Sequence, residues 1–331
     1  MSSPENKIVE NREDIQSTIG KKLPGPVVII TGPTASGKSS VALKLAEIIN
    51  GEIVCADSMQ IYKDMNIGTA KPTQDEMAQI HHHLFGMISP ADTFSVASYV
   101  TIATQTIHNI LDSGKIPILC GGTGQYISAL IDGIEFIPVD TNIELRERLA
   151  HEAELLGINV LMERLESIDP VTAAQLNIND VKRIIRALEV YELTGLTKTQ
   201  INQKSREKGP DFRFLSYCMN VERTKLYNGI DLRVDQMMDH GLLEEVKNIR
   251  HNYPNRSKTA KQAIGYKELE EYLDGKVTCE EAIRIIKQAS RNYAKRQLTW
   301  FRKIPSLNWI ENNNLKETVE NILMDIQLIE S

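Results

Sequence analysis

The stretch Pro26-Val27-Val28-Ile29-Ile30-Thr31-Gly32-Pro33-Thr34-Ala35-Ser36-Gly37-Lys38-Ser39 decides the fold class of this chain. Its first five residues form a short, β-branched apolar run, which predicts a buried strand. The residues from Gly32 to Ser39 match the pattern G-x-x-x-x-G-K-[ST], and a helical stretch at residues 40–49 follows them. A strand, a glycine-rich turn and a helix in this order are the context that a phosphate-binding P-loop requires.

The turn is suited to a diphosphate or a triphosphate. Its glycines let the backbone curl so that N–H groups point at phosphate oxygens, and the N-terminus of the helix adds partial positive charge. Lys38 supplies a full charge, and the Ser39 hydroxyl can ligate Mg²⁺, which we expect as the cofactor. The predicted diphosphate-binding residues are Gly32, Pro33, Thr34, Ala35, Ser36, Gly37, Lys38 and Ser39.

Strands and helices alternate beyond the turn, which predicts an α/β fold, a P-loop NTPase-like parallel sheet flanked by helices. Residues 52–56 form a second predicted strand that ends at Asp57, and residues 115–120 form a third that ends in Gly-Gly-Thr123. Ligands of such sheets bind at the carboxyl ends of the strands. We therefore expect the P-loop, Asp57 and Thr123 to converge on one site.

Changes in composition divide the chain into four parts. Residues 1–23 are a polar N-terminal tail, and residues 24–140 are the first part of the P-loop core. Charged helical patterns without a strand signal fill residues 141–206, which predicts a helical insertion domain. Residues 207–331 complete the core, with a returning strand at 214–221 and mostly helices after it.

The bulk composition is that of an ordinary globular protein, with 41% hydrophobic and 25% charged residues among 331. The net charge of −6 argues mildly against nucleic-acid binding unless basic residues gather on one face. The four cysteines are far apart, which fits reduced thiols and gives no support for zinc. Neither a signal peptide nor a run long enough for a membrane is evident, so we expect a cytoplasmic protein without membrane contact. We also expect a monomer.

A P-loop does not by itself choose between kinases, NTPases and other users of phosphate. The sequence has no guanine-reading N-K-x-D segment, and the third strand ends in Gly-Gly-Thr123 rather than in an acidic Mg²⁺ ligand. Asp57 could nevertheless supply that ligand from the second strand. A small-molecule kinase or NTPase therefore stays open at this point.

Residues 56–72, Ala-Asp-Ser-Met-Gln-Ile-Tyr-Lys-Asp-Met-Asn-Ile-Gly-Thr-Ala-Lys-Pro, together with the P-loop closely resemble the tRNA dimethylallyltransferase family, also called isopentenyl-tRNA transferases. The resemblance runs in order from about residue 25 to 303. The zinc finger of the eukaryotic members is absent, so the chain resembles the bacterial type. The further matches are His82-His83-Leu84, Gly121-Gly122-Thr123-Gly124-Gln125-Tyr126, Asn179-Asp180, Ala187-Leu188-Glu189-Val190, Gln262-Ala263-Ile264-Gly265-Tyr266-Lys267 and Tyr293-Ala294-Lys295-Arg296-Gln297-Leu298-Thr299-Trp300-Phe301-Arg302.

The resemblance implies transfer of a dimethylallyl group from dimethylallyl diphosphate to N6 of the adenosine 3′-adjacent to the anticodon of tRNA. N6 is a poor nucleophile, and a carboxylate that accepts its proton would accelerate the reaction by ~10²–10⁴-fold. Asp57 matches the proposed base of the family; as alternatives it could be a Mg²⁺ ligand or a helix cap. Thr123 and Arg233, the latter matching an arginine that reaches the diphosphate, complete the predicted catalytic set. Arg233 could instead be a solvated helix charge.

A basic stripe without acidic residues offers a path for RNA phosphates. The residues from Arg284 to Lys303 include no Asp or Glu, and five of their basic residues fall within one wedge of a helix at about 100° per residue. The alternative is an ordinary solvated face. We call this wedge the basic stripe; its members are Arg284, Lys287, Arg291, Lys295 and Arg302.

The resemblance implies that the core and the insertion clamp the anticodon stem-loop, with the adenine and the prenyl diphosphate reaching one channel from opposite ends. The mostly helical residues 207–331 should contribute to tRNA binding. The predicted tRNA-binding residues are Asp57, Ser58, Met59, Gln60, Thr123, Lys182, Arg183, Ile184, Ile185, Arg186, Gln262, Ala263, Ile264, Gly265, Tyr266, Lys267, Arg291 and Lys295.

Other functions remain as alternatives. An adenylate isopentenyltransferase would share the P-loop and Asp57 but would not need the basic residues. A non-catalytic RNA-binding module would leave the complete P-loop unexplained. The run His81-His82-His83 suggests a metal, but neighbouring side chains of an extended segment point to opposite faces, and no cluster of further ligands accompanies them. We favour packing or RNA contact for these histidines.

Overall fold

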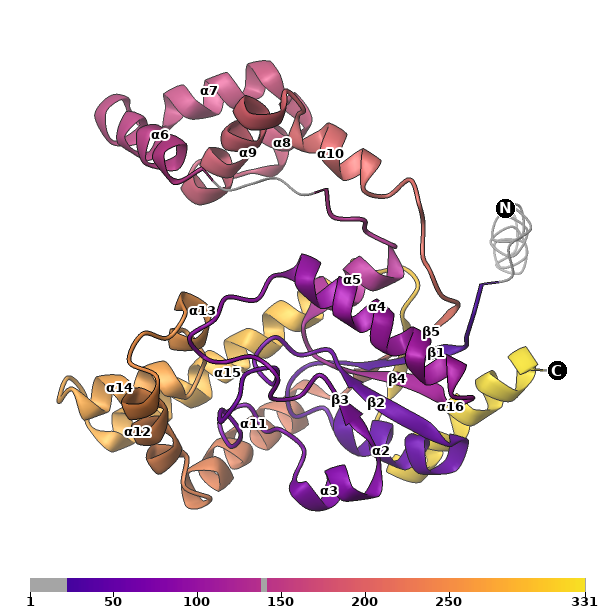
Figure 1. Ribbon diagram of the computed structural model, residues 1–331. Coiled ribbons are helices and arrows are strands. Elements are labelled where there is room, and N and C mark those ends of the chain that lie inside the picture. The colour runs from indigo at the N-terminus through magenta and orange to yellow at the C-terminus, as the bar shows by residue number, and fades with distance from the viewer. Residues whose placement is uncertain (1–22, 138–141, 331) are drawn as a thin grey trace, which may run out of the picture.

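The computed structural model describes residues 23–137 and 142–330, and the predicted tail lies outside them except for Leu23. Six parallel strands form one sheet in the order β3-β2-β4-β1-β5-β6 (Figure 1). The strands are β1 (Val27–Thr31), β2 (Gly51–Cys55), β3 (His82–His83), β4 (Ile116–Gly121), β5 (Phe214–Asn220) and β6 (Asn308–Glu311). The predicted parallel α/β sheet is thereby confirmed.

Two of these strands were not predicted, and both lie at an edge of the sheet. β3 has only two residues, and its histidines gave no strand signal. β6 has four residues, three of them exposed, so it lacks the apolar run of a buried strand. The sequence predicted the four inner strands because those strands bury apolar residues on both faces.

The helices that cover the two faces of the sheet are α2 (Lys38–Ile49), α4 (Val96–Asp112), α5 (Gly124–Ile131) and α16 (Leu315–Glu330). Because side chains alternate along a strand, β1 contributes to two apolar clusters. Val27 and Ile29 pack with α4 and α5, whereas Val28 and Ile30 pack with α2 and α16. The side chains of all four residues are fully buried. The P-loop therefore starts from the best-anchored strand of the molecule.

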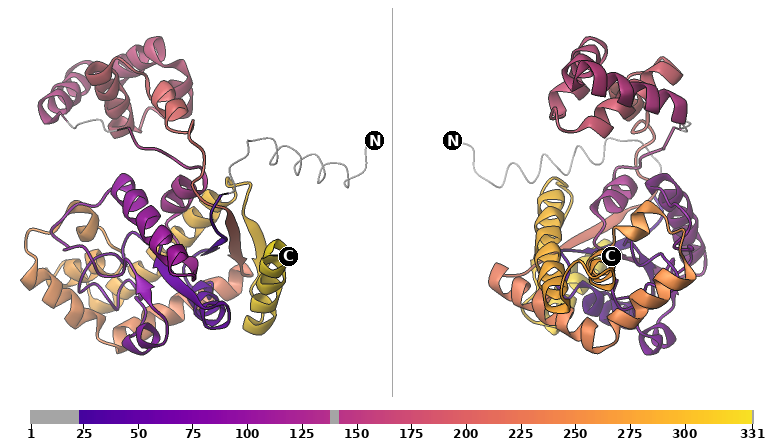
Figure 2. Two further views of the ribbon diagram at one scale, coloured as in Figure 1. Left: turned by 45° about the vertical axis from the view of Figure 1, so that its right-hand side comes forward. Right: turned by 90° about the vertical axis from the view of Figure 1, so that its left-hand side faces the viewer.

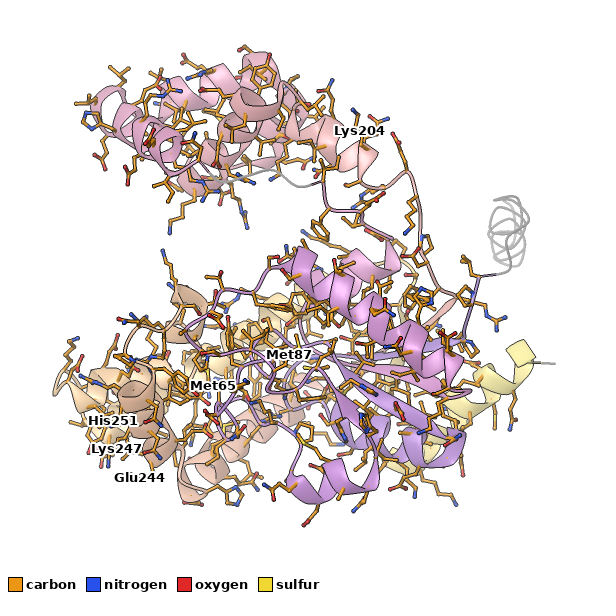
Figure 3. All side chains as sticks on the ribbon, viewed as in Figure 1. Met65, Met87, Lys204, Glu244, Lys247 and His251 are labelled. Atoms are coloured by element: carbon orange, nitrogen blue, oxygen red, sulfur yellow. The ribbon has the colours of Figure 1, made fainter. Side chains whose placement is uncertain are left out.

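A second group of helices packs beside the carboxyl edge of the sheet (Figure 1). It comprises α11 (Arg223–Asp239), α12 (Leu242–Asn252), α13 (Lys258–Lys261), α14 (Tyr266–Leu273) and α15 (Cys279–Phe301), and the short α3 (Gln74–Gln79) lies apart from it. α12 is amphipathic. Leu242 and Val246 are buried, while Glu244, Lys247 and His251 lie on its outer side (Figure 3). The apolar cluster formed by these helices also takes in Tyr62, which follows β2.

Five helices between the core segments form an insertion that we call the insertion helices. They are α6 (Ile143–Leu156), α7 (Ile158–Ile168), α8 (Pro170–Gln175), α9 (Val181–Thr194) and α10 (Lys198–Lys204). They have an apolar cluster of their own, centred on Leu149, Leu161 and Leu188. Figures 1 and 2 show them standing away from the sheet and joined to the core by two chain segments. The helical character predicted for this region is confirmed, whereas α10 was not predicted.

Two carboxylates, Asp169 and Glu189, are buried among the described residues of the insertion helices. Glu189 has no exposed surface, and its carboxylate accepts hydrogen bonds from Arg146, Arg186 and the backbone N–H of Asn142 at 2.7–3.0 Å. Burial alone would raise the pKa of Glu189, but these hydrogen bonds hold it below its ordinary value.

In the part of the chain that the structure describes, no helix is both long and apolar enough to cross a membrane.

Candidate active site

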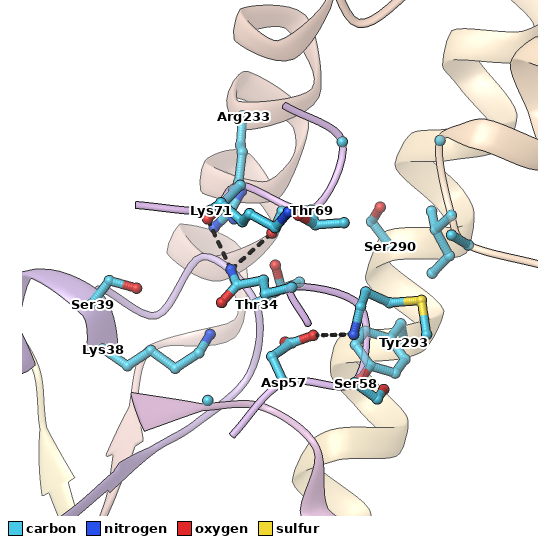
Figure 4. A pocket seen from close by; sticks show the side chains of 18 of the residues that line it. Thr34, Lys38, Ser39, Asp57, Ser58, Thr69, Lys71, Arg233, Ser290 and Tyr293 are labelled. Carbon is cyan, nitrogen blue, oxygen red and sulfur yellow. Dashed lines mark hydrogen bonds between the residues drawn. The ribbon is translucent and has the colours of Figure 1, made fainter. Parts of the chain in front are cut away.

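A cavity of about 460 Å³ lies at the carboxyl ends of the strands (Figure 4). Its walls come from the P-loop, the segment after β2, α11, the turn before α14, and α15. Lys38, Asp57 and Arg233 reach it from three separate elements. The structure thus brings together three side chains that the sequence places almost two hundred residues apart.

The P-loop has the curled backbone that its glycines allow. Gly32 and Gly37 have φ angles of 148° and 80°, which favour glycine. A Cβ at Gly32 would come within 2.9 Å of the Ser36 hydroxyl, so a side chain there would clash with the turn. The Lys38 ammonium donates to the Pro33 carbonyl at 3.3 Å, which holds it over the loop. The geometry is that of an anion-binding turn at a helix N-terminus.

The charges around the cavity are incompletely balanced. Burial lowers the pKa of Lys38, and the nearby Arg233 lowers it further, whereas Asp57 acts in the opposite direction. Burial also lowers the pKa of Arg233, again with Asp57 opposing. Two desolvated cations therefore share one carboxylate. A multiply charged anion in the cavity would restore the charge balance.

Only one oxygen of the Asp57 carboxylate accepts a hydrogen bond from the described residues. Its Oδ1 accepts a hydrogen bond from the N–H of Met59 at 2.9 Å, which fixes the orientation of the group (Figure 4). The residues that follow form a turn, so Asp57 caps a turn rather than a helix. This local bond leaves Oδ2 available to accept a proton from a ligand.

Thr123 supports the segment that carries Asp57. Its Oγ1 accepts a hydrogen bond from the N–H of Ser58 at 2.8 Å and lies 3.2 Å from the Ser58 hydroxyl. Thr123 also hydrogen-bonds the phenol of Tyr293 on α15, whose pKa is raised mainly by burial and also by the charge of Asp57. Thr123 therefore lies one residue away from the predicted base, and Tyr293 is a site residue that the sequence did not single out.

Gln297 joins three segments of the site. Its Oε1 accepts from the N–H of Thr34 at 2.9 Å, and its Nε2 donates to the carbonyl of Gly122 at 2.8 Å. A Cβ at Gly122 would lie 2.2 Å from this Nε2, which explains the glycine. The match from Tyr293 to Arg302 contained Gln297, but only the fold shows what this buried side chain holds.

The residues present are compatible with Mg²⁺ bound together with a diphosphate. Ser39 lines the cavity and offers a hydroxyl oxygen. Among the described residues, no three His, Cys, Asp or Glu side chains gather into a metal-binding group. This fits Mg²⁺, which in phosphate sites takes most of its oxygens from phosphate and water.

The histidine run and the cysteines have structural partners. His83 Nε2 lies 2.6 Å from Glu52 Oε2, and His82 Nδ1 lies 2.7 Å from the carbonyl of Ile80. These contacts agree with packing, one of the two roles that we favoured, and leave RNA contact a prediction. Cys55, Cys120 and Cys218 are buried, and burial is the main cause that raises the pKa of each thiol. They are therefore structural thiols rather than nucleophiles.

The predicted RNA contacts near the core take different places. Gln60, Gln262 and Ile264 line the cavity, as do Ala263, Gly265, Ser58 and Met59. Tyr266 is buried, and its hydroxyl donates to Glu245 at 2.5 Å, while Lys267 is exposed. Tyr266 therefore supports the cavity wall from behind.

The predicted contacts on α9 differ in their exposure. Ile184 and Ile185 are buried in the apolar cluster of the insertion helices. Lys182 and Arg183 are exposed, and Arg186 pairs with Glu189. Lys182 lies near Lys258 of α13, and its proximity lowers the pKa of Lys258.

The basic stripe is less positive than its own sequence indicates. Arg291 pairs with Asp231 and Lys287 with Asp235, at 2.5 and 2.7 Å, and both acids belong to α11. Arg284 pairs with Glu281 at 2.6 Å. The segment that carries the basic stripe contains no acidic residue, but α11 and the first turn of α15 place acidic side chains beside it. Lys295 is exposed and carries no ion pair among the described residues.

A P-loop on a central strand of a parallel sheet, facing a cavity that is lined by Lys38, Asp57 and Arg233, places the chain in the class of P-loop α/β proteins. Residues 60–304 match the family model described as IPP transferase, and the chain belongs to this family. It is 48% identical over 283 residues to the tRNA dimethylallyltransferase of Halothermothrix orenii, with 86% of each chain covered. It is 44% identical to that of Carboxydothermus hydrogenoformans, covering 89% of this chain and 94% of the relative.

Solved structures agree with this assignment. The full-length tRNA isopentenylpyrophosphate transferase from Bacillus halodurans aligns with a TM-score of 0.68 at 38% identity, covering 91% of this chain and 95% of that one. A eukaryotic dimethylallyltransferase acting on tRNA aligns with a TM-score of 0.79 at 27% identity, covering 92% and 80%. The resemblance found in the sequence is thereby confirmed.

Proposed function

We propose that this protein transfers a dimethylallyl group from dimethylallyl diphosphate to N6 of the adenosine 3′-adjacent to the anticodon of tRNA. Its relatives are named tRNA dimethylallyltransferases over most of their length. The observation that carries the proposal is a cavity at the P-loop in which the carboxylate of Asp57 acts on two desolvated cations, Lys38 and Arg233. A proton acceptor and a site for the diphosphate therefore lie in the same cavity.

The reaction forms a bond between N6 and C1 of the prenyl group, while the bond from C1 to the bridging oxygen breaks. Asp57 Oδ2 receives the N6 proton, and the diphosphate leaves with the bonding electron pair. Lys38, Arg233 and the P-loop amides stabilise the charge that grows on the leaving group. Thr123 and Tyr293 keep the Asp57 turn in place and are positioning residues in this scheme.

Mg²⁺ is the proposed cofactor, and Ser39 with the diphosphate would hold it. When bound, the ion neutralises part of the charge of the leaving diphosphate. The sequence pattern and the cavity position of Ser39 support this assignment.

The proposed RNA site lies between the core and the insertion helices, which we treat as a separate domain. Lys182 and Lys258 support it, because two exposed lysines from opposite sides meet without a carboxylate between them in the described chain. An RNA phosphate would balance both charges. A monomeric, cytoplasmic protein is consistent with a substrate that is itself cytoplasmic.

The deciding experiment is mass spectrometry of tRNA after incubation with the protein, Mg²⁺ and dimethylallyl diphosphate. We expect the adenosine beside the anticodon to gain one prenyl group, and an anticodon stem-loop lacking that adenosine to gain none. AMP offered in parallel tests the nucleotide-prenylating alternative, and phosphate release from ATP tests the kinase or NTPase alternative. Prenylation of AMP alone, or phosphate release without prenyl transfer, would refute the proposal.

A further inference from the structure

A side-chain amide near the C-terminal end of the chain is bound to the P-loop. Asn312 directly follows β6, and its Nδ2 donates to the carbonyl of Ser36 at 2.7 Å. The N–H of Asn312 donates to the carbonyl of Asn220 at 3.0 Å, which continues the ladder between β5 and β6. The side-chain contact joins residues 276 positions apart, so the fold rather than the local sequence creates it.

This contact fixes the direction of a P-loop amide. The peptide between Ser36 and Gly37 is trans, so its carbonyl and its N–H point in opposite directions. Holding the Ser36 carbonyl toward Asn312 therefore directs the Gly37 N–H away from Asn312. In a P-loop the inward N–H groups are the ones that bind phosphate.

The approach is close and leaves little freedom. A Cβ at Gly37 would lie 2.6 Å from Asn312 Nδ2, so the amide occupies the space that a side chain would need. Asn312 itself is held by Thr318, whose Oγ1 lies 3.2 Å from Asn312 Oδ1 and 2.9 Å from the carbonyl of Asn314. Thr318 is 1% exposed and belongs to α16, which packs against α2 directly behind the P-loop.

We propose that Asn312 is a positioning residue that sets the affinity of the P-loop for diphosphate, with Thr318 holding it in place. The inference rests on the proposed function only in taking the P-loop as the diphosphate site. Asn312 does not line the cavity among the described residues, so it acts through the Ser36–Gly37 peptide. The edge strand β6 thus contributes to the site although it is remote from the reacting atoms.

The first test is calorimetric titration of the full-length protein with inorganic diphosphate and Mg²⁺. Asn312→Ala removes the donor, and we expect about fivefold to tenfold weaker binding, the effect of one net hydrogen bond. Asn313→Ala is the matched control, because Asn313 is exposed and its side chain carries no hydrogen bond in the described structure. Equal affinity of the Asn312→Ala and Asn313→Ala variants would overturn the proposal.

A second pair of variants separates positioning from simple stability. Thr318→Val keeps the shape but loses the hydroxyl, whereas Thr318→Ser retains it. We expect Thr318→Val to raise the KM for dimethylallyl diphosphate while kcat and the KM for tRNA stay unchanged, and Thr318→Ser to behave like the parent protein. Equal changes in both KM values, in proportion to a lower Tm, would show a purely structural role and refute the proposal.

These readouts also separate this inference from the proposed function. If the parent protein binds diphosphate but does not prenylate tRNA, the proposed function fails and the binding comparison still decides the role of Asn312. If the parent protein prenylates tRNA and Asn312→Ala binds diphosphate as tightly as the parent, only the role of Asn312 fails.

Discussion

The cavity and the insertion helices treat buried charge in opposite ways. In the cavity, Lys38 and Arg233 are desolvated and share the single carboxylate of Asp57. Among the insertion helices, the buried Glu189 is bound by two arginines and a backbone N–H. The positive charge in the cavity can be balanced by an anionic ligand. In the insertion helices, the buried carboxylate of Glu189 is already balanced by the protein itself.

This difference predicts where mutations will affect chemistry and where they will affect only folding. Preorganised, incompletely balanced charges are what catalysis of charge-separating reactions needs. A fully satisfied buried carboxylate instead resembles a structural ion-pair network. Substitutions at Asp57, Glu189, Gln297 and the basic stripe, taken from the largest expected effect to the smallest, test the contrast.

The largest effect should follow removal of the Asp57 carboxylate from the cavity. Asp57→Ala should lower turnover by ~10²–10⁴-fold, because N6 loses its proton acceptor. Single-turnover measurements with prenyl-labelled donor would give the rate, and filter binding would show that tRNA affinity survives. Turnover within a few fold of the parent protein would remove Asp57 as the base.

Asp57→Asn sharpens the same test. The amide oxygen can still accept the hydrogen bond from the Met59 N–H, so the turn should stay intact. We expect turnover as low as with alanine. If Asp57→Asn were fully active while Asp57→Ala was not, Asp57 would be a turn residue and not a proton acceptor.

In the insertion, Glu189→Gln should destabilise without touching the chemistry. Breaking a buried ion pair costs about 3–5 kcal/mol, and we expect the lower end because both arginines are more than one-third exposed on their side chains. Both tryptophans lie outside the insertion helices, on α15 and β6, so circular dichroism should report earlier loss of helix while tryptophan fluorescence changes little. Glu166→Gln, at an exposed position of α7, is the control.

Acid should reproduce this effect in the parent protein. Because the pKa of Glu189 is lowered in the folded state, its stabilisation is present above the ordinary value of 4.5 and is lost as pH falls through the folded pKa. The helix signal of the insertion should therefore weaken as the pH falls below 4.5, and Glu189→Gln should flatten this dependence. An identical pH profile for both proteins would contradict the assignment.

A smaller effect is expected where α15 meets the P-loop. Gln297→Met keeps the length of the side chain but leaves the N–H of Thr34 and the carbonyl of Gly122 without their partner. We expect a loss of about 1–3 kcal/mol in the free energy of unfolding, measured by urea titration. Glutamine at 297 would be dispensable if the midpoint and slope of the transition did not change.

The sequence was sufficient for those features that local patterns encode. The P-loop, the four inner strands and Asp57 follow from apolar runs and from the rule that ligands bind at strand ends. The insertion helices followed from charged helical periodicity. Each of these signals lies within a short window of the chain.

Features that depend on distant partners were not predictable in this way. Gln297 and Asn312 bind backbone atoms 263 and 276 residues away, and no spacing rule connects them to the P-loop. The basic stripe was judged by its own composition, but Asp231 and Asp235, which neutralise part of it, lie 60 and 52 residues earlier. Local charge counts describe a segment and not the surface that the fold builds from it.

The smallest expected effect comes from this stripe and separates its paired and unpaired members. Lys295 is exposed and lacks an ion pair in the described chain, so it is available to a phosphate, whereas Arg291 is engaged by Asp231. Lys295→Gln should weaken tRNA binding and reduce the slope of log K against log salt by about one. Arg291→Gln should change the slope less, because an RNA phosphate would have to displace Asp231. The two slopes, measured by filter binding between low and physiological salt, would be equal if α11 released its acids on binding RNA, and neither would change if the stripe faces solvent.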